Sequence, residues 1–494
     1  MVRQASIAAS TVCLFLGACV VGPNYQLPTS SLFNAPESQG SFSSKTKAIV
    51  VEAPVSNWWR LYNDQRLAGF VEKALVANTD LRAAEANLER AHALLAEAET
   101  ARQINGAANF DTSYVQQSAE SYLSHTKPPQ HEIANTGISI TYDLDLFGRI
   151  RRGIESATSA DEAAVAARDL VRVNVAADTT RAYADICNGG NELNSARRTV
   201  RVQKQAIAFT GALVSNGRAA RFDIDRQQGL YAELQSRIPL LEARQRNAAY
   251  RLMMLVGEPP EKLDRSLLSC KSPLELSSPI AVGDARALLR RRPDVRAAER
   301  RLAAASAIIG VETADLYPDV KIGASIGTQG AAPDLFGALT NRFGVGPTIS
   351  WNINQNVARA RIAAAQAQSR ADLASFDRAV LTALREIESA LTSYAFSLDR
   401  LKNLKDARDR AAKVAKDARE LWQGGSTDAL TSLEADRSLA AAEQAYAAGQ
   451  TDVNLNQIAI FLALGGGWEA PSQIDAAEGL AGKGETKDTH SHAG

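Results

Sequence analysis

Residues 137–146 read GISITYDLDL, and this stretch decides the fold class. From Ile138 to Leu146 every second residue is apolar, and serine, threonine or aspartate stands between them. Such strict alternation predicts a β-strand with one apolar and one polar face. A length near ten residues suits a strand of a transmembrane barrel, although a half-buried strand of a soluble sheet would give the same pattern. This stretch alone leaves both interpretations open.

The same alternation occurs in three other places. Val320 to Ile326 and Phe343 to Ile353 alternate clearly, whereas the pattern from Ala108 to Tyr114 is weaker. Small or polar residues separate the apolar ones in each segment, as they do in barrel strands. The sequence therefore predicts four strands, at about 104–116, 135–147, 317–329 and 342–354.

The four strands fall into two similar halves of the chain. Residues 78–88 read NTDLRAAEANL, and residues 292–302 read RPDVRAAERRL. Further matched pairs follow in the same order at an offset of roughly 210 residues, whereas chance matches would scatter. We therefore expect two tandem repeats, over residues 65–260 and 281–467, joined by a linker at 261–280.

Each repeat is expected to contain a helix, two strands, a very long helical stretch, a glycine break and a second long helix. Asp80 and Asp294 are well placed as N-caps of the first helix of each repeat. Residues 356–421 contain no proline and are rich in alanine. At 1.5 Å per residue, about 65 helical residues span on the order of 100 Å, which is too long for a compact α+β domain. Such lengths indicate coiled-coil-like pairing of helices.

The N-terminus has the pattern of a bacterial export signal. A cationic start precedes an apolar run that is shorter than the roughly 20 residues of a spanning helix. Leu16-Gly17-Ala18-Cys19 resembles a lipobox, in which the cysteine is lipidated and begins the mature chain. The alternative is an ordinary signal that happens to contain a cysteine. We expect a signal peptide at 1–18 and a lipidated N-terminal segment at 19–64. No aspartate follows Cys19, which favours the outer membrane.

The composition argues against several classes of function. The 55 Lys and Arg residues balance the 55 Asp and Glu residues, so the basic excess typical of nucleic-acid binding is missing. The sequence has no phosphate loop, dinucleotide fingerprint or cluster of metal ligands. His490 and His492 could bind a metal weakly, but they lie in a polar tail, 468–494, that we expect to be disordered. We expect no enzyme activity, no metal and no cofactor besides the covalent lipid on Cys19.

Cys187 and Cys270 are the other cysteines of the mature chain. Two cysteines so far apart in sequence do not make a disulfide framework. They could pair, but we expect them to be small buried apolar side chains.

Four amphipathic strands cannot close a barrel by themselves. Open sheet edges are not tolerated in lipid, because their backbone groups would go unpaired. The smallest membrane barrels have about eight strands. Two chains would give eight strands, with an interior largely filled by side chains, and three chains would give twelve around a wider channel. The composition alone does not choose between a dimer and a trimer.

Several short motifs occur in a fixed order along the chain. The most specific is Arg292-Pro293-Asp294-Val295-Arg296-Ala297-Ala298-Glu299. The others are Val21-Gly22-Pro23-Asn24-Tyr25 after the lipobox, Asn57-Trp58-Trp59, Asn78-Thr79-Asp80-Leu81, Asp145-Leu146-Phe147-Gly148-Arg149, and Ile309-Gly310 before Tyr317-Pro318. From the lipobox to about Trp468, the chain resembles the outer-membrane factor family (TolC/OprM type), in particular the lipidated NodT-type outlets of RND efflux systems.

The resemblance implies a mixed α/β membrane protein that forms a homotrimer. Its twelve strands would form a barrel in the outer membrane, and its helices would continue as a long α-helical barrel through the periplasm. It would conduct small molecules such as drugs passively, after a periplasmic membrane-fusion adaptor and an RND inner-membrane pump deliver them. A belt around the middle would use Trp58-Trp59, a break at Asn188-Gly189-Gly190 and the C-terminal region.

The resemblance also assigns roles to the turns between the long helices. The residues that would form the adaptor-facing periplasmic tips are Gly217, Arg218, Gly424 and Gly425. Relatives close the tip with a leucine and an aspartate one helical turn apart, and the matching residues here are Leu430 and Glu434. Asp225 has the corresponding position in the first repeat. Three copies of Glu434 would form an acidic ring, as in cation-selective pores, although Glu434 could instead be a solvated helix carboxylate.

Two other functions remain open at this point. The chain could be the outlet of a type I secretion system, which exports proteins or peptides. It could also be a lipid-anchored periplasmic coiled-coil scaffold without a pore. The four alternating segments argue against the scaffold, since it has no use for apolar faces opposite polar ones. The transported substrate and the identities of the pump and adaptor do not follow from the sequence.

Overall fold

The computed structural model of the chain describes residues 20–43, 47–116, 118–120, 123 and 125–466. The chain forms two compact units, each built from three segments. The described residues of the sheet unit fall within Met1–Thr29, Asn87–Val165 and Ala297–Phe376, and those of the hairpin unit fall within Ser30–Ala86, Ala166–Arg296 and Asp377–Gly494. The longest helices contribute residues to both units.

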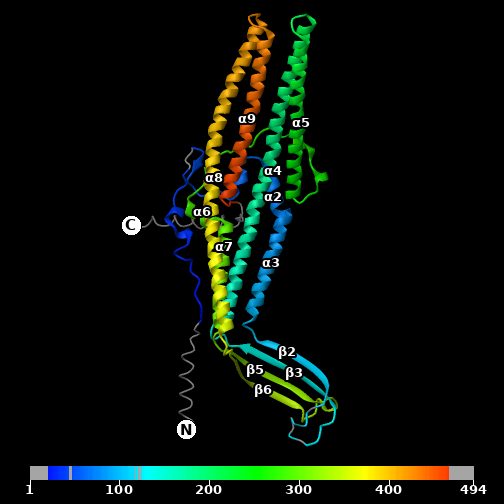
Figure 1. The fold of residues 1–494 in the computed structure, drawn as a ribbon, viewed down its shortest axis with the longest axis vertical. Helices are drawn as coiled ribbons and strands as arrows, with labels where there is room; N and C mark the ends of the chain where they lie inside the picture. The colour runs from blue at the N-terminus through cyan, green and yellow to red at the C-terminus, as the bar shows by residue number, and fades with distance from the viewer. Residues whose placement is uncertain (1–19, 44–46, 117, 121–122, 124, 467–494) are drawn as a thin grey trace, which may run out of the picture. The chain divides into compact units, whose positions relative to one another are not determined.

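Long helices and a four-stranded sheet make up most of the structure (Figure 1). The helices are α2 (Gln65–Ala77), α3 (Thr79–Thr100), α4 (Arg149–Ser215), α5 (Arg221–Leu255), α6 (Ala285–Arg291), α7 (Pro293–Ala314), α8 (Asn356–Gln423) and α9 (Ala429–Ala463). The strands are β1 (Ile49–Val50), β2 (Asn105–Val115), β3 (His131–Asp143), β4 (Ile280–Ala281), β5 (Asp319–Ala331) and β6 (Asn341–Ser350). Within the described part of the chain, no helix has both the length and the apolar character needed to cross a membrane.

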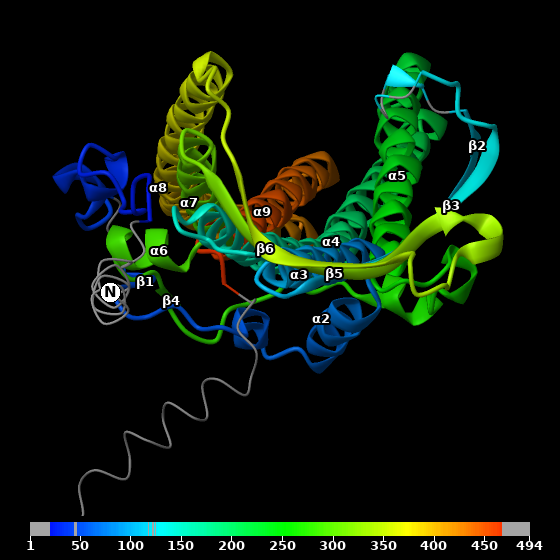
Figure 2. The ribbon, with the colours of Figure 1, turned by 90° about the horizontal axis from the view of Figure 1, so that it is seen from below.

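The sheet is antiparallel, with strand order β2-β3-β5-β6, and it is visibly curved (Figure 2). Its register places Ile138 opposite Ile326, and Ile326 opposite Phe343. These three apolar side chains therefore form one row across the sheet, on the same face. Strand β3 begins at His131 rather than at 135, and β6 ends at Ser350 rather than at 354, so the expected and observed strands differ mainly at their ends.

Asp145 explains why a very long helix begins directly after β3. Its carboxylate accepts hydrogen bonds from the backbone amides of Ile150 and Arg151, at 2.9 and 2.8 Å. These amides belong to the first turn of α4, where no carbonyl is available to accept from them. Gly148 precedes the helix with a φ of 79°, a left-handed conformation that favours glycine. The Asp145–Gly148 segment is thus a strand-to-helix turn with its own cap.

The hairpin unit is held together by a core of apolar side chains from α2, α4, α5, α8, α9 and the N-terminal segment. Trp58 is almost fully buried and stacks on Phe461 in α9, with ring centroids 4.5 Å apart. Leu67, Ile186 and Leu252 are also fully buried in this cluster. Burying a side chain of this size contributes about 1.5–3 kcal/mol, so the cluster joins the helices firmly.

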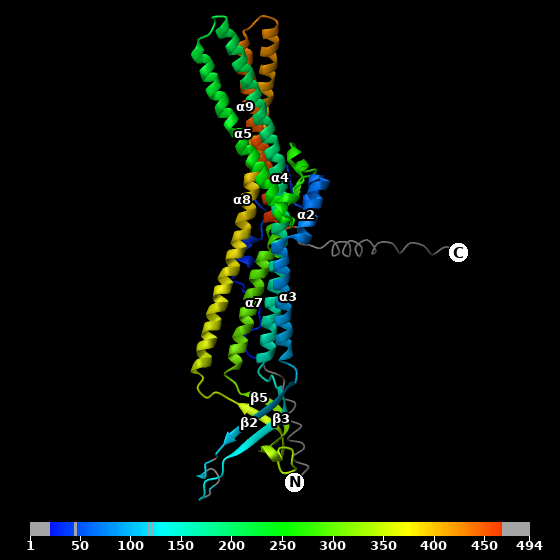
Figure 3. The ribbon, with the colours of Figure 1, turned by 90° about the vertical axis from the view of Figure 1, so that its right-hand side faces the viewer.

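Two helical hairpins, α4–α5 and α8–α9, extend from this core (Figure 3). Helices α4 and α8 have 67 and 68 residues, and α5 and α9 have 35 residues each. The two halves of the chain therefore contain helices of nearly equal length in the same order. Pro239 lies inside α5, where it removes one backbone donor.

The structure corrects the expectation of a helix break at Asn188-Gly189-Gly190. Helix α4 continues through all three residues. A Cβ atom on Gly190 would lie 1.9 Å from the carbonyl oxygen of Cys270. The glycine is therefore needed because another segment crosses the helix closely at this point, and not because the helix ends.

The same crossing corrects the expectation for the two cysteines. Cys187 and Cys270 form a disulfide bond between α4 and the segment that follows α5. Gln245 supports the crossing, because its side-chain amide donates to the carbonyl oxygens of Ile186 and Leu268, both at 3.1 Å. Sequence spacing did not reveal the pair, since it depends on how residues 256–270 return to α4.

The helix caps also differ from the expected ones. The side-chain oxygen of Asn78, rather than that of Asp80, accepts from the amides of Asp80 and Leu81, at 2.9 and 3.1 Å. Asp294 does not cap α7 either. Its carboxylate accepts from the Arg292 side chain at 2.7 and 3.0 Å, and the same buried arginine also pairs with Glu386.

Candidate functional site

The two hairpin tips have the same backbone geometry. At the first tip, the amide of Arg218 donates to the carbonyl of Leu213 at 2.8 Å, and Gly217 donates to Val214 at 3.0 Å. At the second tip the corresponding bonds join Ser426 to Leu421 and Gly425 to Trp422, at 2.8 and 3.0 Å. This pair of bonds is the Schellman motif, which ends a helix with a left-handed residue. Gly217 and Gly425 supply that residue, with φ values of 69° and 74°.

The residues expected to face an adaptor lie on the surface. Gly217 and Arg218 are exposed at the α4–α5 tip, and Gly424 and Gly425 are exposed at the α8–α9 tip. A Cβ atom on Gly217 or Gly425 would have no neighbour within 4 Å. The glycines are therefore required for the turn itself, and the space around them is open to a binding partner.

The expected gate residues lie near the tips, on two different hairpins. Leu430 and Glu434 are four residues apart in α9, so they share one side of that helix. Leu430 is 54% exposed, and the Glu434 carboxylate is also exposed and forms an ion pair with Arg437 at 3.1 Å. Asp225 is exposed in α5. In one chain the Glu434 carboxylate is thus solvated and has a cationic neighbour.

Asp428 is a tip residue that the sequence reasoning missed. Its carboxylate accepts from the backbone amide of Thr431 at 2.7 Å and caps α9. This hydrogen bond, which favours the ionised form, lowers the pKa of Asp428 below its ordinary value of 3.8. An aspartate directly before an apolar, alanine-rich run is the pattern of an N-cap and would have identified it.

Polar side chains join the two hairpins along α4 and α9. The amide of Asn454 lies 3.0 Å from that of Asn188, and the hydroxyl of Thr451 donates to Glu192 at 2.7 Å. Arg198 donates to Glu443 at 2.8 Å. These polar pairs, spaced one to two turns apart, fix the register of the two helices. We call this row the α4–α9 seam.

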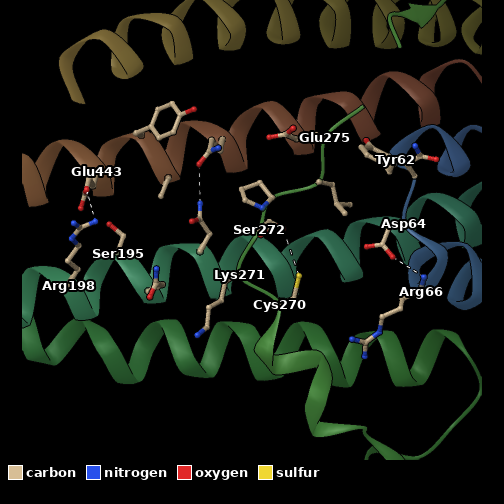
Figure 4. Close-up of a pocket in the computed structure, with 18 of the residues that line it drawn as sticks. Tyr62, Asp64, Arg66, Ser195, Arg198, Cys270, Lys271, Ser272, Glu275 and Glu443 are labelled. Atoms are coloured by element: carbon tan, nitrogen blue, oxygen red, sulfur yellow. Dashed lines mark hydrogen bonds and ion pairs between the residues drawn. The ribbon is translucent and has the colours of Figure 1, made fainter. Parts of the chain in front are cut away.

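A polar groove of about 990 Å³ adjoins the seam (Figure 4). It is lined by residues of α4, α9 and the segment from Cys270 to Glu275. The Arg198–Glu443 ion pair lies on its wall, and Asp64 caps α2 at the opposite end by accepting from the amide of Arg66 at 2.9 Å. These interactions fix helices and do not pair a nucleophile with a base. Among the described residues, no group of three His, Cys, Asp or Glu is placed to hold a metal ion.

The sheet exposes the apolar row defined above. Ile138, Ile326 and Phe343 are 58%, 67% and 87% exposed. Contiguous exposed apolar surface of this kind marks a membrane or protein contact. Within the described residues, the edge strands β2 and β6 are each paired on one side only. The sheet therefore exposes a row of apolar side chains and has two edges, at β2 and β6, that no other described strand covers.

This combination defines a class of protein: the outer-membrane channels, which join membrane strands to long periplasmic helices. The sequence model of the family described as outer membrane efflux protein matches residues 70–258 and 285–466. The chain therefore belongs to the outer membrane efflux protein family. It is an outer-membrane protein that extends into the periplasm, and its relatives are efflux channels rather than enzymes.

Similar proteins cover nearly the whole chain. Nodulation protein T of Rhizobium leguminosarum bv. viciae is 28% identical over 485 residues, covering 96% of this chain and 95% of the relative. Outer membrane protein OprJ of Pseudomonas aeruginosa is 26% identical and covers 94% and 96%. The solved structure of the outer-membrane channel OprN is 32% identical, with a TM-score of 0.81 over 91% of this chain and 100% of that chain.

Cys19 and the tail at 468–494, with His490 and His492, lie outside the described residues. The lipid on Cys19 therefore stays a prediction from the lipobox.

Proposed function

We propose that this chain is the outlet of a tripartite RND-type efflux system and passively conducts small molecules such as drugs to the exterior. The observation that carries the proposal is the exposed apolar row of Ile138, Ile326 and Phe343. An apolar face of this kind is stable against lipid hydrocarbon, whereas in water it would be costly. Membership in the efflux family supports the same conclusion.

The functional unit in this proposal is a homotrimer. One chain supplies four antiparallel strands with open edges at β2 and β6. Edges in lipid must be paired, and three copies would close a barrel of twelve strands. The helices of the three chains would then continue the channel as an α-helical barrel. Structural similarity to the OprN channel over 91% of the chain supports this architecture.

We also propose that each chain consists of two tandem repeats. The matching helix lengths, the paired Schellman tips and the two segments matched by the family support this interpretation. In the trimer the repeats would alternate around the axis. A periplasmic adaptor would contact the exposed tips at Gly217, Arg218, Gly424 and Gly425, and an inner-membrane RND pump would supply the cargo. Lipid on Cys19 would anchor the chain, and drug efflux would contribute to antibiotic resistance.

The gate in this proposal is formed by Leu430 and Glu434, with Asp225 on the neighbouring hairpin. Three leucines close to the axis would exclude water, and three carboxylates would select cations. The Arg437 side chain, 3.1 Å from Glu434, would reduce the repulsion between the carboxylates. This pairing explains how an acidic ring could remain closed.

Single-channel recording tests the conduit and the gate together. The mature protein would be purified from outer membranes, and wild type would be compared in a planar bilayer with Glu434→Ala. The matched control is Glu420→Ala, which removes an exposed α8 carboxylate that is 3.8 Å from Lys416. We expect wild-type channels that are mostly closed, higher conductance or reduced cation preference in Glu434→Ala, and no change in the control.

Each other outcome rejects a defined part of the proposal. If Glu434→Ala channels have the same conductance and cation preference as wild type, the chain is a channel but the gate assignment is wrong. If folded protein gives no current, Leu430→Ser should be added to open the gate. If the protein with Leu430→Ser also gives no current, the result would favour the periplasmic scaffold. Currents blocked by an added polypeptide substrate, and not by small drugs, would favour a type I secretion outlet.

A further inference from the structure

The first described residues of the chain are held in a specific seat in the sheet unit. Residues 20–25 pack against the turn before α4, the first turn of α4, and α7. The backbone amide of Val21 donates to the carbonyl of Phe147 at 3.1 Å. This segment contains the Val-Gly-Pro-Asn-Tyr motif, whose purpose the sequence alone did not explain. We call the surface that receives it the N-terminal seat.

Arg152 is the centre of the seat. Its side chain is only 4% exposed. The guanidinium donates to the carbonyl oxygens of Val21 and Gly22, at 3.2 and 3.1 Å, and to the side-chain oxygen of Asn24 at 2.7 Å. Glu155 accepts from the remaining side at 2.7 Å and balances the charge. The planar fork of an arginine is suited to several acceptors at fixed positions, which a lysine cannot satisfy together.

Three glycines allow residues 20–25 to lie close to the turn before α4, to α4 and to α7. Gly22 has a φ of 85°, and a Cβ atom on it would lie 2.4 Å from the Cα of Gly310. A Cβ on Gly310 would in turn lie 2.7 Å from the Arg152 side chain. At Gly148 a Cβ would lie 2.7 Å from Val20. The Gly22–Gly310 contact joins two backbones, so no side-chain movement can relieve the steric clash that a substitution at Gly22 would cause.

Tyr25 fixes the other end of the segment. Its hydroxyl donates to Glu299 in α7 at 3.1 Å, and the guanidinium of Arg300 lies 5.9 Å from its ring. Contacts at Val21, Gly22, Asn24 and Tyr25 therefore hold the segment over its length. A linker with no positional role would not need a buried arginine and a glycine pair.

We propose that Arg152 is a positioning residue that fixes the lipid anchor of the mature chain at the turn where β3 meets α4. The proposal rests on the proposed lipidation of Cys19, which precedes Val20 by one peptide bond. This turn separates exposed apolar strands from helices, so it is the level at which an acyl chain must leave the protein to enter the same membrane. If residues 20–29 were loose, the anchor could move by up to roughly 35 Å, since an extended chain spans about 3.5 Å per residue.

Hydrogen exchange on the full-length protein from outer membranes tests the seat. The amide of Val21 is the reporter, because its hydrogen bond to Phe147 exists only when the segment is docked. We expect the Val21 amide to exchange at least tenfold faster in Arg152→Met and Gly22→Ala than in wild type. In Arg152→Lys its exchange rate should lie between that of wild type and that of Arg152→Met. The matched controls are Arg151→Met, an exposed neighbour, and Gly153→Ala, where a Cβ would meet nothing within 4 Å. Both controls should exchange like wild type, and helix unfolding by circular dichroism should be unchanged in all variants.

The position of the lipid is measured separately. Cells would be labelled with a photoactivatable palmitate analogue, and cross-linked peptides would be mapped. We expect wild-type cross-links to concentrate in the peptides next to the β3–α4 turn and to spread in Arg152→Met, while intact mass shows equal lipidation. Equal exchange or equal cross-link maps in wild type and Arg152→Met would overturn the proposal. A wild-type chain whose mass shows no lipid would instead refute the lipidation itself, and single-channel currents would show independently whether the conduit stands.

Discussion

At the scale of single residues, Asn78 decides where a long helix begins. It is 2% exposed, it accepts from the amides of Asp80 and Leu81, and its side-chain amide donates to the carbonyl of Leu255 at 3.0 Å. One side chain therefore caps α3 and ties it to the end of α5. We expect Asn78→Ala to destabilise the protein by about 2–3 kcal/mol, because it removes a cap and leaves a buried carbonyl unpaired.

Asp80→Ala is the control for this substitution. Asp80 is exposed and makes no capping bond with its side chain, so we expect a change within about 0.5 kcal/mol. Urea unfolding followed by circular dichroism would measure both. Equal losses of unfolding free energy in the two variants would mean that Asp80 contributes as much to the start of the helix as Asn78 does.

This residue also shows what sequence reasoning could and could not give. Asn, Asp, Ser and Thr all cap helices, so Asn78-Thr79-Asp80 offers three candidates in a row. In the structure Asn78 is the cap, and its side-chain amide also donates to the carbonyl of Leu255, a residue far away in sequence. The start of the helix was predictable to within two residues, but its capping atom depended on tertiary structure.

At the scale of elements, the crossing at Gly190 joins α4 to the segment after α5. A Cβ atom there would lie 1.9 Å from a backbone carbonyl, at the position next to the Cys187–Cys270 disulfide. We expect Gly190→Ala to displace the segment and to destabilise the hairpin unit by about 2–4 kcal/mol, as overpacking at a backbone contact does. Urea unfolding and the rate of disulfide reduction would both report the change.

Gly211→Ala is the matched control, because Gly211 lies in the same helix and a Cβ there would meet nothing within 4 Å. Alanine is the better helix former by about 1 kcal/mol, so this variant should be as stable as wild type or more stable. A stable Gly190→Ala protein with an intact disulfide would show that the crossing segment can move without cost.

Elements differed in how well the sequence predicted them. The strand positions followed from period-two alternation, which reports a two-faced environment directly. The continuity of α4 did not, because Gly189-Gly190 is a breaker signal in sequence and a close-packing device in the structure. The disulfide was missed for the same reason, since its partners meet only after α5 has returned along α4.

At the scale of the whole molecule, the two hairpin tips have the same backbone geometry, and this allows a quantitative test of the proposed duplication. Gly217 and Gly425 have similar φ values and identical hydrogen-bond patterns. Alanine in the left-handed conformation costs about 1–2 kcal/mol. We therefore expect Gly217→Ala and Gly425→Ala to lower hydrogen-exchange protection at their own tips by similar factors, about 5–30-fold each.

Gly229→Ala in α5 serves as the control for the tips, since a Cβ there would meet nothing within 4 Å and its φ is not positive. It should leave the protection at both tips unchanged. A large effect at only one tip would mean that the two turns are similar in geometry but differ in what stabilises them, contrary to the proposed equivalence.

Pro239 makes the two hairpins differ in their backbone hydrogen bonding. Without its amide, the carbonyl of Gln235 loses its partner one turn later, so α5 can bend at a defined place. The sequence of α9 contains no proline, so α9 does not lose a backbone donor in this way. In the proposed trimer, hairpins with and without this proline would alternate around the axis. We would then expect the tips to move by bending of the α4–α5 hairpins, which are every second hairpin around the axis.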